Sequence, residues 1–269
     1  MDFKGTCRRA GMIPALRPNL MVGDMRDTGL PTRIARFLLK RFVHRTDMRI
    51  LASRSLNDVD ERQFRWLGDE TKQFLSDVET DVAARRPAAK LGDLPSFGNR
   101  PMVDLAINTV SADRVLRRLG AEPSLSADIV ADIGWETYRG LLSFHSAPIR
   151  LITRYPGRRP RWTNRLLLVF PFNPSGAPGY RVQVSREGPD ILTRFINCPP
   201  LSFARRLGEA TGDLQVLEAF KRSSCSYDWP SADWIARDGC QGHYRRTRSP
   251  SQGDPECGMC WRAGACLGV

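Results

Sequence analysis

The chain has 269 residues, 41% of them hydrophobic and 26% charged, which is the composition of an ordinary globular protein rather than a disordered one. Its formal net charge is +12 at pH 7, but its basic clusters are short and match no nucleic-acid-binding signature, so we expect no specific nucleic-acid partner. No stretch approaches the roughly 20 apolar residues that span a bilayer, and the first residues lack the apolar core of a secretory signal. We therefore expect a cytoplasmic protein without a transmembrane segment.

The N-terminal residues 1–24 show no regular period and are expected to form a flexible arm before a single domain over residues 25–269. Residues 33–45 are predicted to form a basic amphipathic helix. Its apolar stripe consists of Ile34, Phe37, Leu38 and Phe42. A helix of this kind can dock on a protein core or lie on a membrane surface. We expect the docked arrangement, and the role of the helix stays open.

The first part of the domain, residues 25–146, is predicted to be mainly helical because its apolar residues recur at helical spacing. Pro87 stops the second helix, Pro101 opens the third, and Gly120 is expected to end it. The linker between the second and third helices covers residues 87–100. After the basic helix, the expected helices cover residues 58–86, 101–120 and 124–144.

The second part, residues 147–265, is predicted to bear a sheet, because apolar and polar residues begin to alternate near Ile149. Two hairpins, residues 179–198 and 243–263, are expected to belong to one antiparallel sheet, with short helices between them. Further strands are expected at 149–155 and 166–172, and the short helices at 201–208 and 213–224. Helices followed by antiparallel strands give an α+β fold class.

The cysteines gather in the C-terminal region, where six of the seven lie beyond residue 197. An odd number of cysteines without a secretory signal argues against a disulfide framework. A cysteine-rich C-terminus instead indicates a site or a buried cluster. Cys198 ends a predicted strand, and Cys225 and Asp228 lie three residues apart at a predicted helix end, so both can project from one face.

The final hairpin adds Arg246, Gly253, Asp254 and Cys257 to this set. In this order and spacing, residues 191–262 resemble the L-2-amino-thiazoline-4-carboxylic acid hydrolase family, which carries a cysteine after a strand, Cys-x-x-Asp, and then Arg…Gly-Asp-x-x-Cys. The family usually continues with an acidic and an aromatic residue, where this chain has Gly258 and Met259. The resemblance implies a hydrolase that acts on carbon–nitrogen bonds and opens a small cyclic amidine-type carboxylate.

The resemblance also implies roles for the matched residues. Asp228 is expected to act as acid and base, and Cys225 or Cys257 as nucleophile or pocket wall. The substrate-binding residues are expected to be Arg246, Asp254 and Cys198. Simpler structural roles stay open for these residues: Cys198 as core, Asp228 as a cap, Asp254 as a turn residue, Arg246 as surface charge and Cys257 as a half-buried strand residue. The expected partner is a small anionic molecule, and the sequence carries no signal for an oligomeric state.

Two alternatives come from other classes of protein. The Gly-Asp-x-x-Cys ending is also similar to small-ligand-binding domains of the 4-vinyl reductase type, which implies a sensor without turnover. The second alternative is a zinc-stabilised interaction domain. Its ligands would be Cys240, His243, Cys257 and Cys260. Apart from this zinc set, no cofactor is expected.

We predict that the purified protein carries less than one equivalent of zinc and keeps its structure in a chelator. Cys257 and Cys260 lie three residues apart in a predicted strand and would point to opposite faces. Metal analysis and circular dichroism with and without chelator check this prediction. Stoichiometric zinc that is lost together with the fold would contradict it, because structural zinc contributes folding free energy directly.

Overall fold

A computed structural model describes the chain in separate stretches, and the expected N-terminal arm lies outside them. The described residues are 30–53, 56–57, 63–64, 68–153, 159–188, 190–225 and 243–262.

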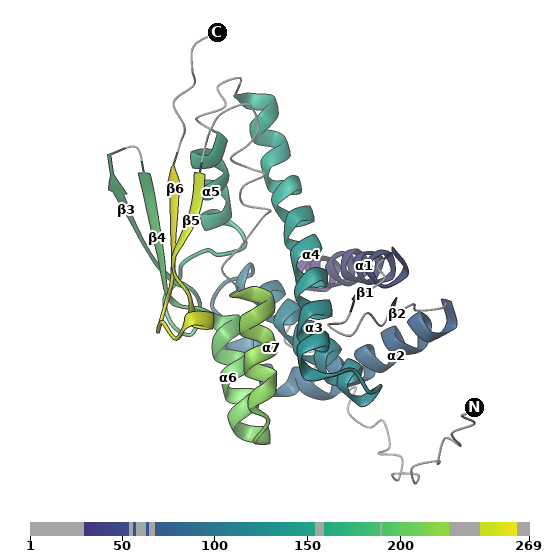
Figure 1. The fold of residues 1–269 in the computed structure, drawn as a ribbon. Helices are drawn as coiled ribbons and strands as arrows, with labels where there is room; N and C mark the ends of the chain where they lie inside the picture. Colours follow the sequence, from purple (N-terminus) through teal and green to yellow (C-terminus); the bar gives the residue numbers. More distant parts are fainter. Residues whose placement is uncertain are drawn as a thin grey trace, which may run out of the picture.

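Helices dominate the first part of the chain, and two more follow strand β4 (Asp190–Asn197). In Figure 1 most of them lie in the lower part of the molecule. Their bounds are α1 Leu30–Ser53, α2 Gly68–Arg85, α3 Asn99–Arg118, α4 Pro123–Ile152, α5 Arg159–Val169, α6 Pro199–Thr211 and α7 Leu214–Ser224. The charges of α2 suit both of its ends: it has acidic residues in its first turn and Arg85 in its last, which complement the helix dipole. Among the helices of the described stretches, none combines the length and the apolar character needed to cross a bilayer.

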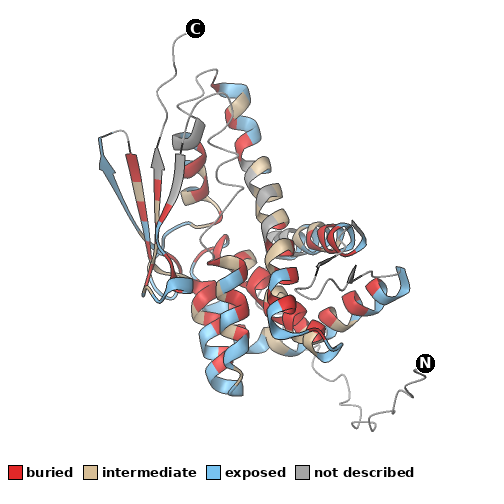
Figure 2. Ribbon diagram, viewed as in Figure 1, coloured by how far each residue is buried: buried red, intermediate tan, exposed pale blue. Residues whose placement is uncertain are grey.

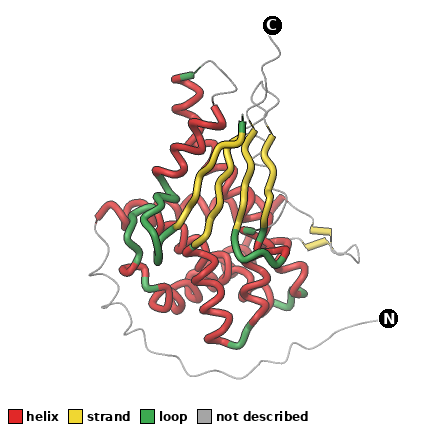
Figure 3. The backbone as a smooth tube through the Cα atoms, turned by 90° about the vertical axis from the view of Figure 1, so that its left-hand side faces the viewer, coloured by secondary structure: helices red, strands yellow, loops and turns green. Residues whose placement is uncertain are grey.

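The strands form one antiparallel sheet in the order β3-β4-β6-β5, together with a separate two-residue pairing, β1 with β2. The bounds are β1 Leu56–Asn57, β2 Gln63–Phe64, β3 Arg181–Glu187, β4 Asp190–Asn197, β5 His243–Arg248 and β6 Cys257–Arg262. The α+β class and the union of both predicted hairpins in one sheet are confirmed. Turned by 90°, the four strands stand in front of the helices, which lie against one face of the sheet (Figure 3).

The predicted strands at 149–155 and 166–172 are wrong. Helix α4 continues to Ile152 with Pro148 inside it, and α5 covers 159–169. The alternation from Ile149 onward is only a few residues long, and a short apolar run fits a buried helix as well as a strand. The helical part therefore extends about one helix further along the chain than its predicted end at residue 146.

Helix ends also differ from the prediction. The basic helix α1 runs well beyond the expected 33–45 at its C-terminal end, and α2 begins at Gly68 rather than at residue 58. Apolar periodicity identifies a helix more securely than it fixes its ends, because caps and tertiary contacts decide where hydrogen bonding stops.

The main hydrophobic core lies among the helices. Figure 2 shows buried residues on the inner faces of α2, α3, α6 and α7, and the buried cluster also includes residues of α1 and α4. Completely or almost completely buried members include Phe74, Ile107, Leu116, Ile129 and Val216. A smaller apolar cluster joins this helical body to the sheet and contains Met102, Tyr180 and Phe195.

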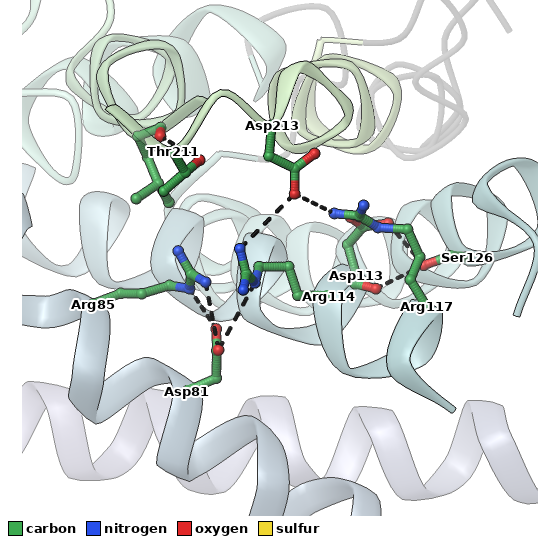
Figure 4. Close-up of polar contacts among 9 residues, drawn as sticks. Asp81, Arg85, Asp113, Arg114, Arg117, Ser126, Thr211 and Asp213 are labelled. Atoms are coloured by element: carbon green, nitrogen blue, oxygen red, sulfur yellow. Dashed lines mark hydrogen bonds and ion pairs between the residues drawn. The ribbon is translucent and has the colours of Figure 1, made fainter. Parts of the chain in front are cut away.

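A polar network fastens α7 to the helices beside it (Figure 4). The Arg117 guanidinium of α3 donates to Asp113 at 2.9 Å and to Asp213, the residue before α7, at 3.1 Å. Ser126 of α4 donates to Asp113 at 2.7 Å. Burial alone would raise the pKa of Asp213, but the hydrogen bond and charge of Arg117 lower that pKa below its ordinary value. The network fixes the start of α7.

A buried carboxyl group in α1 makes stability depend on pH. Asp47 is 5% exposed, and its Oδ1 has no hydrogen-bond partner within the described part of the chain. Burial raises the pKa of Asp47 to about 8. The folded protein therefore binds this proton more tightly than the unfolded chain, and stability falls as the pH rises toward 8.

We predict that Asp47→Asn stabilises the protein at neutral and alkaline pH, because the amide needs no proton to stay neutral. Its advantage in unfolding free energy over the parent should grow by on the order of 2–4 kcal/mol from about pH 5 to about pH 8. Urea denaturation across this range measures the change. Asp69→Asn, on the exposed start of α2, is the control and should leave the pH slope unchanged. Equal slopes for Asp47→Asn and the parent would show that Asp47 is ionised in the folded state.

Candidate functional site

The register of the sheet places several of the predicted site residues on one face. Phe195 of β4 lies opposite Cys257 of β6, and Arg246 of β5 lies opposite Met259 of β6. Directly opposed residues share a face, and residues two apart on a strand do so too. Phe195, Cys257, Met259 and Arg246 therefore form one continuous surface of the sheet.

Two helix ends bring further cysteines to this surface. Cys198 follows β4 and is the N-cap residue of α6, where its carbonyl accepts a hydrogen bond from Ser202 N at 2.9 Å. Cys225 is the C-cap residue of α7, with its amide bonded to Lys221 O at 2.8 Å. Each cysteine is thus fixed by the hydrogen bonding of a helix terminus.

Tyr180 closes the surface from the segment before β3. Its amide donates to Asn99 Oδ1 at 3.2 Å, and Asn99 Nδ2 donates to Pro171 O at 3.3 Å. Gly98 permits this close packing, because a Cβ there would lie 2.5 Å from Pro171 O. Phe172, Tyr180 and Phe195 meet edge to face with ring centroids 5.1–5.9 Å apart.

These elements enclose a cavity of about 110 Å³ between the helices and the sheet. Cys198, Cys225, Arg246 and Cys257 all line it. The rest of its inner wall is mostly aromatic or methionine: Met102, Tyr138, Phe172, Tyr180, Phe195 and Met259. Exposed Arg205 and Pro255 lie where the lining reaches the surface.

Arg246 is the buried cation of this cavity, with 2% of its surface exposed. Its Nη1 donates to the carbonyl oxygen of Cys225 at 2.8 Å. The same oxygen accepts from Ser251 Oγ at 3.0 Å and from Ser249 Oγ. The final carbonyls of a helix need partners outside it and carry its negative partial charge, so this oxygen is a suitable acceptor for an arginine.

The thiols of the cavity are neutral at physiological pH. Burial raises the pKa of Cys198 to about 12, and it raises the pKa of Cys225 and of Cys257 as well. The positive charge of Arg246 acts in the opposite direction on all three thiols without reversing the effect of burial. Because the thiolate is the nucleophile, such thiols react slowly.

Other charges near the cavity are arranged around Glu256. Its Oε1 accepts from Arg194 at 2.6 Å and from Arg248 at 2.7 Å. Glu256 also lines the cavity. Together with Arg246, these residues amount to three guanidinium groups and one carboxylate, so the local balance is positive.

Of the two remaining predicted site residues, one is described by the structure. Asp254 belongs to the turn between β5 and β6, where its Oδ2 accepts from Ser249 N at 2.7 Å, which is the turn role left open by the sequence. Asp228 lies outside the described residues. The structure therefore gathers four of the six predicted residues, and their chemical roles remain proposals.

The alternative zinc set is not brought together within the described stretches. Strand β6 continues through both Cys257 and Cys260, so the turn that the set would need between them is not formed. Cys240 and the side chain of His243 lie outside the described part. No group of three or more potential ligands that could hold a metal occurs among the described residues.

The small size of Gly258 suits the space at its position in β6. A Cβ at this position would lie 2.5 Å from Thr247 Oγ1, where the pairing of β5 with β6 shifts register between Arg246 and Arg248. A side chain at residue 258 would require the Thr247 hydroxyl to turn away and would crowd the Arg248 amide at 3.3 Å. Residue 258 also alternates away from the cavity, whereas Met259 lines it.

Sequence reasoning missed the aromatic wall and the two serines. Tyr138 and Met102 come from helices that are distant in sequence from the cysteines, and no local pattern connects the two sets. Ser249 and Ser251 flank Pro250 in the predicted turn, where serine is common for local reasons. The serine pair beside the predicted arginine is the one signal that was available.

No protein-family model matches the chain, and searches of curated proteins and of solved structures also found no match.

We predict that Cys198, Cys225 and Cys257 resist alkylation in the folded protein. At pH 8, iodoacetamide should modify Cys198 at least about 100-fold more slowly than a free cysteine, because little thiolate forms when the pKa is near 12. Site-resolved mass spectrometry measures the rates, and the urea-unfolded chain supplies the control. Rapid modification of Cys198 before unfolding would contradict the raised pKa described above.

Proposed function

We propose that this chain binds a small anionic molecule in the cavity and that Arg246 receives its acidic group. The observation that carries the proposal is a buried guanidinium in a wall otherwise made largely of aromatic rings, methionines and neutral thiols. A guanidinium presents a planar set of donors that matches a carboxylate. The apolar wall suits the body of the molecule.

The surrounding charge supports an anionic ligand. Arg194 and Arg248 already bind the carboxylate of Glu256, so this carboxylate is neutralised and does not oppose an anion at Arg246. Burial lowers the effective dielectric constant and strengthens attraction between the guanidinium and an incoming anion. A net positive cleft also raises the local concentration of anions.

The volume limits the size of the ligand. An engineered apolar cavity of about 150 Å³ holds benzene, so a cavity of about 110 Å³ suits a small ring or a short chain, with any larger part directed toward Arg205. A five-membered cyclic amidine carboxylate, the substrate class implied by the resemblance, falls within this range. Binding without turnover is the function that the geometry supports best.

Hydrolysis is the second candidate. Four residues of the matched pattern lie on one cavity, which favours a substrate site there. The raised pKa values of the Cys225 and Cys257 thiols favour a role as cavity wall over attack as thiolate. Ring opening would then need an attacking water, with Asp228 as the acid and base that the resemblance implies.

We predict that Arg246→Lys weakens binding of L-2-amino-thiazoline-4-carboxylate by about tenfold or more, because lysine keeps the charge but loses the planar fork. Calorimetry measures affinity, and mass spectrometry of the same mixture detects any ring-opened product. Bound but unchanged probe supports a sensor, and ring-opened product supports the hydrolase.

Two control variants separate charge recognition from structural effects. Arg248→Lys changes an exposed arginine of the same strand and should leave affinity within about twofold. Ser251→Ala removes a donor to the Cys225 carbonyl without touching the cavity charge. Equal losses in Arg246→Lys and Ser251→Ala would mean that Arg246 acts only by fixing that carbonyl, and unchanged affinity in Arg246→Lys would refute the proposal.

A further inference from the structure

Helix α1 differs along its length in what it contacts. Its C-terminal half is docked, with Val43, Ile50 and Leu51 buried. Phe42 packs directly on Gly140 of α4, where any side chain would collide with the phenylalanine ring. The N-terminal half instead exposes large apolar side chains: Leu30 at 68%, Ile34 at 52%, Phe37 at 61% and Leu38 at 58%. Docking explains only the C-terminal half of the helix.

The four exposed residues, here called the α1 face, fall on one side of the helix. Their spacing of four, three and one residues is that of a single helical stripe. Helix α1 lies on the opposite side of α4 from α7 and from the sheet (Figure 1). The α1 face is therefore separate from the cavity and from the binding function proposed for it.

The charged residues that the N-terminal part of α1 itself contributes all have one sign. Residues 30–46 contain five arginines and lysines and no aspartate or glutamate. Lys40 and His44 reach Glu79 of α2, at 2.8 Å and 3.1 Å, which ties the middle of the helix to the body. Exposed basic residues flank the apolar stripe: Arg33, Arg41 and Arg45.

We propose that the α1 face docks on an anionic membrane surface, with its apolar residues at the level of the headgroups and its arginines on lipid phosphates. Apolar residues on one side and basic residues beside them are the properties of an interfacial helix, which lies on a bilayer without crossing it. A second copy of the chain is a poor occupant, because it would bring two cationic faces together in a protein that carries a net charge of +12.

Vesicle co-sedimentation tests the proposal with the full chain. We expect binding to phosphatidylcholine vesicles that contain about 30% phosphatidylserine, and at least tenfold weaker binding to phosphatidylcholine alone. The double variant Phe37→Glu/Leu38→Glu should lose at least tenfold in affinity for the anionic vesicles, because it removes apolar contact and adds negative charge. Raising the salt concentration should weaken binding of the parent.

The matched control is Leu214→Glu, which places the same substitution on an apolar residue of α7 that is 67% exposed. It should bind anionic vesicles as the parent does, and the melting temperatures of all variants should agree. Equal binding by the parent and the double variant would overturn the proposal, because the net charge alone would then account for attraction. Failure of the parent to bind, or a dimer in solution that the double variant abolishes, would also overturn it.

Discussion

The carbonyl oxygen of Cys225 is the acceptor on which the candidate site depends. It ends α7, and the side chains of Arg246, Ser249 and Ser251 all donate to it from the final hairpin. A carbonyl oxygen has two lone pairs, so these three donors compete for it and at least one can turn to another acceptor at small cost. Because Arg246 carries the charge and borders the cavity, it is the donor best placed to share itself with a ligand.

Helix α7 connects the Cys225 carbonyl with the helical body, because polar groups bind the helix at both of its ends. At its start, the carboxylate of Asp213 accepts a hydrogen bond from Arg117 of α3. At its end, the carbonyl oxygen of Cys225 accepts one from Arg246 of β5. The N-terminus of a helix attracts negative groups and its C-terminus attracts positive ones, so both contacts agree with the helix dipole. Burial of Val216 and Phe220 between these ends supplies the apolar contact. The cavity is thus built at one end of a helix that is fixed at the other.

The elements that could be predicted from the sequence were those with long periodic patterns. The two hairpins have long alternations and clear turns, and their sheet was predicted. The segment from Ile149 has only a short alternation, and α4 continues through it with Pro148 inside the helix. Within the site, Cys198, Cys225, Arg246 and Cys257 were accessible because they follow one ordered pattern. Tyr138 and Met102 were not, because only the packing of α4 and α3 on the sheet brings them there.

The same burial has opposite effects on the two kinds of polar group in the cavity. It removes the water that would stabilise a thiolate, which keeps the thiols of Cys198, Cys225 and Cys257 protonated. It also strengthens the field of Arg246, which stays charged in any protein environment because its intrinsic pKa is so high. A cavity of this kind does not readily create negative charge on its own thiols. It favours a molecule that brings a negative charge with it, and this is the physical reason to place ligand binding before thiolate chemistry.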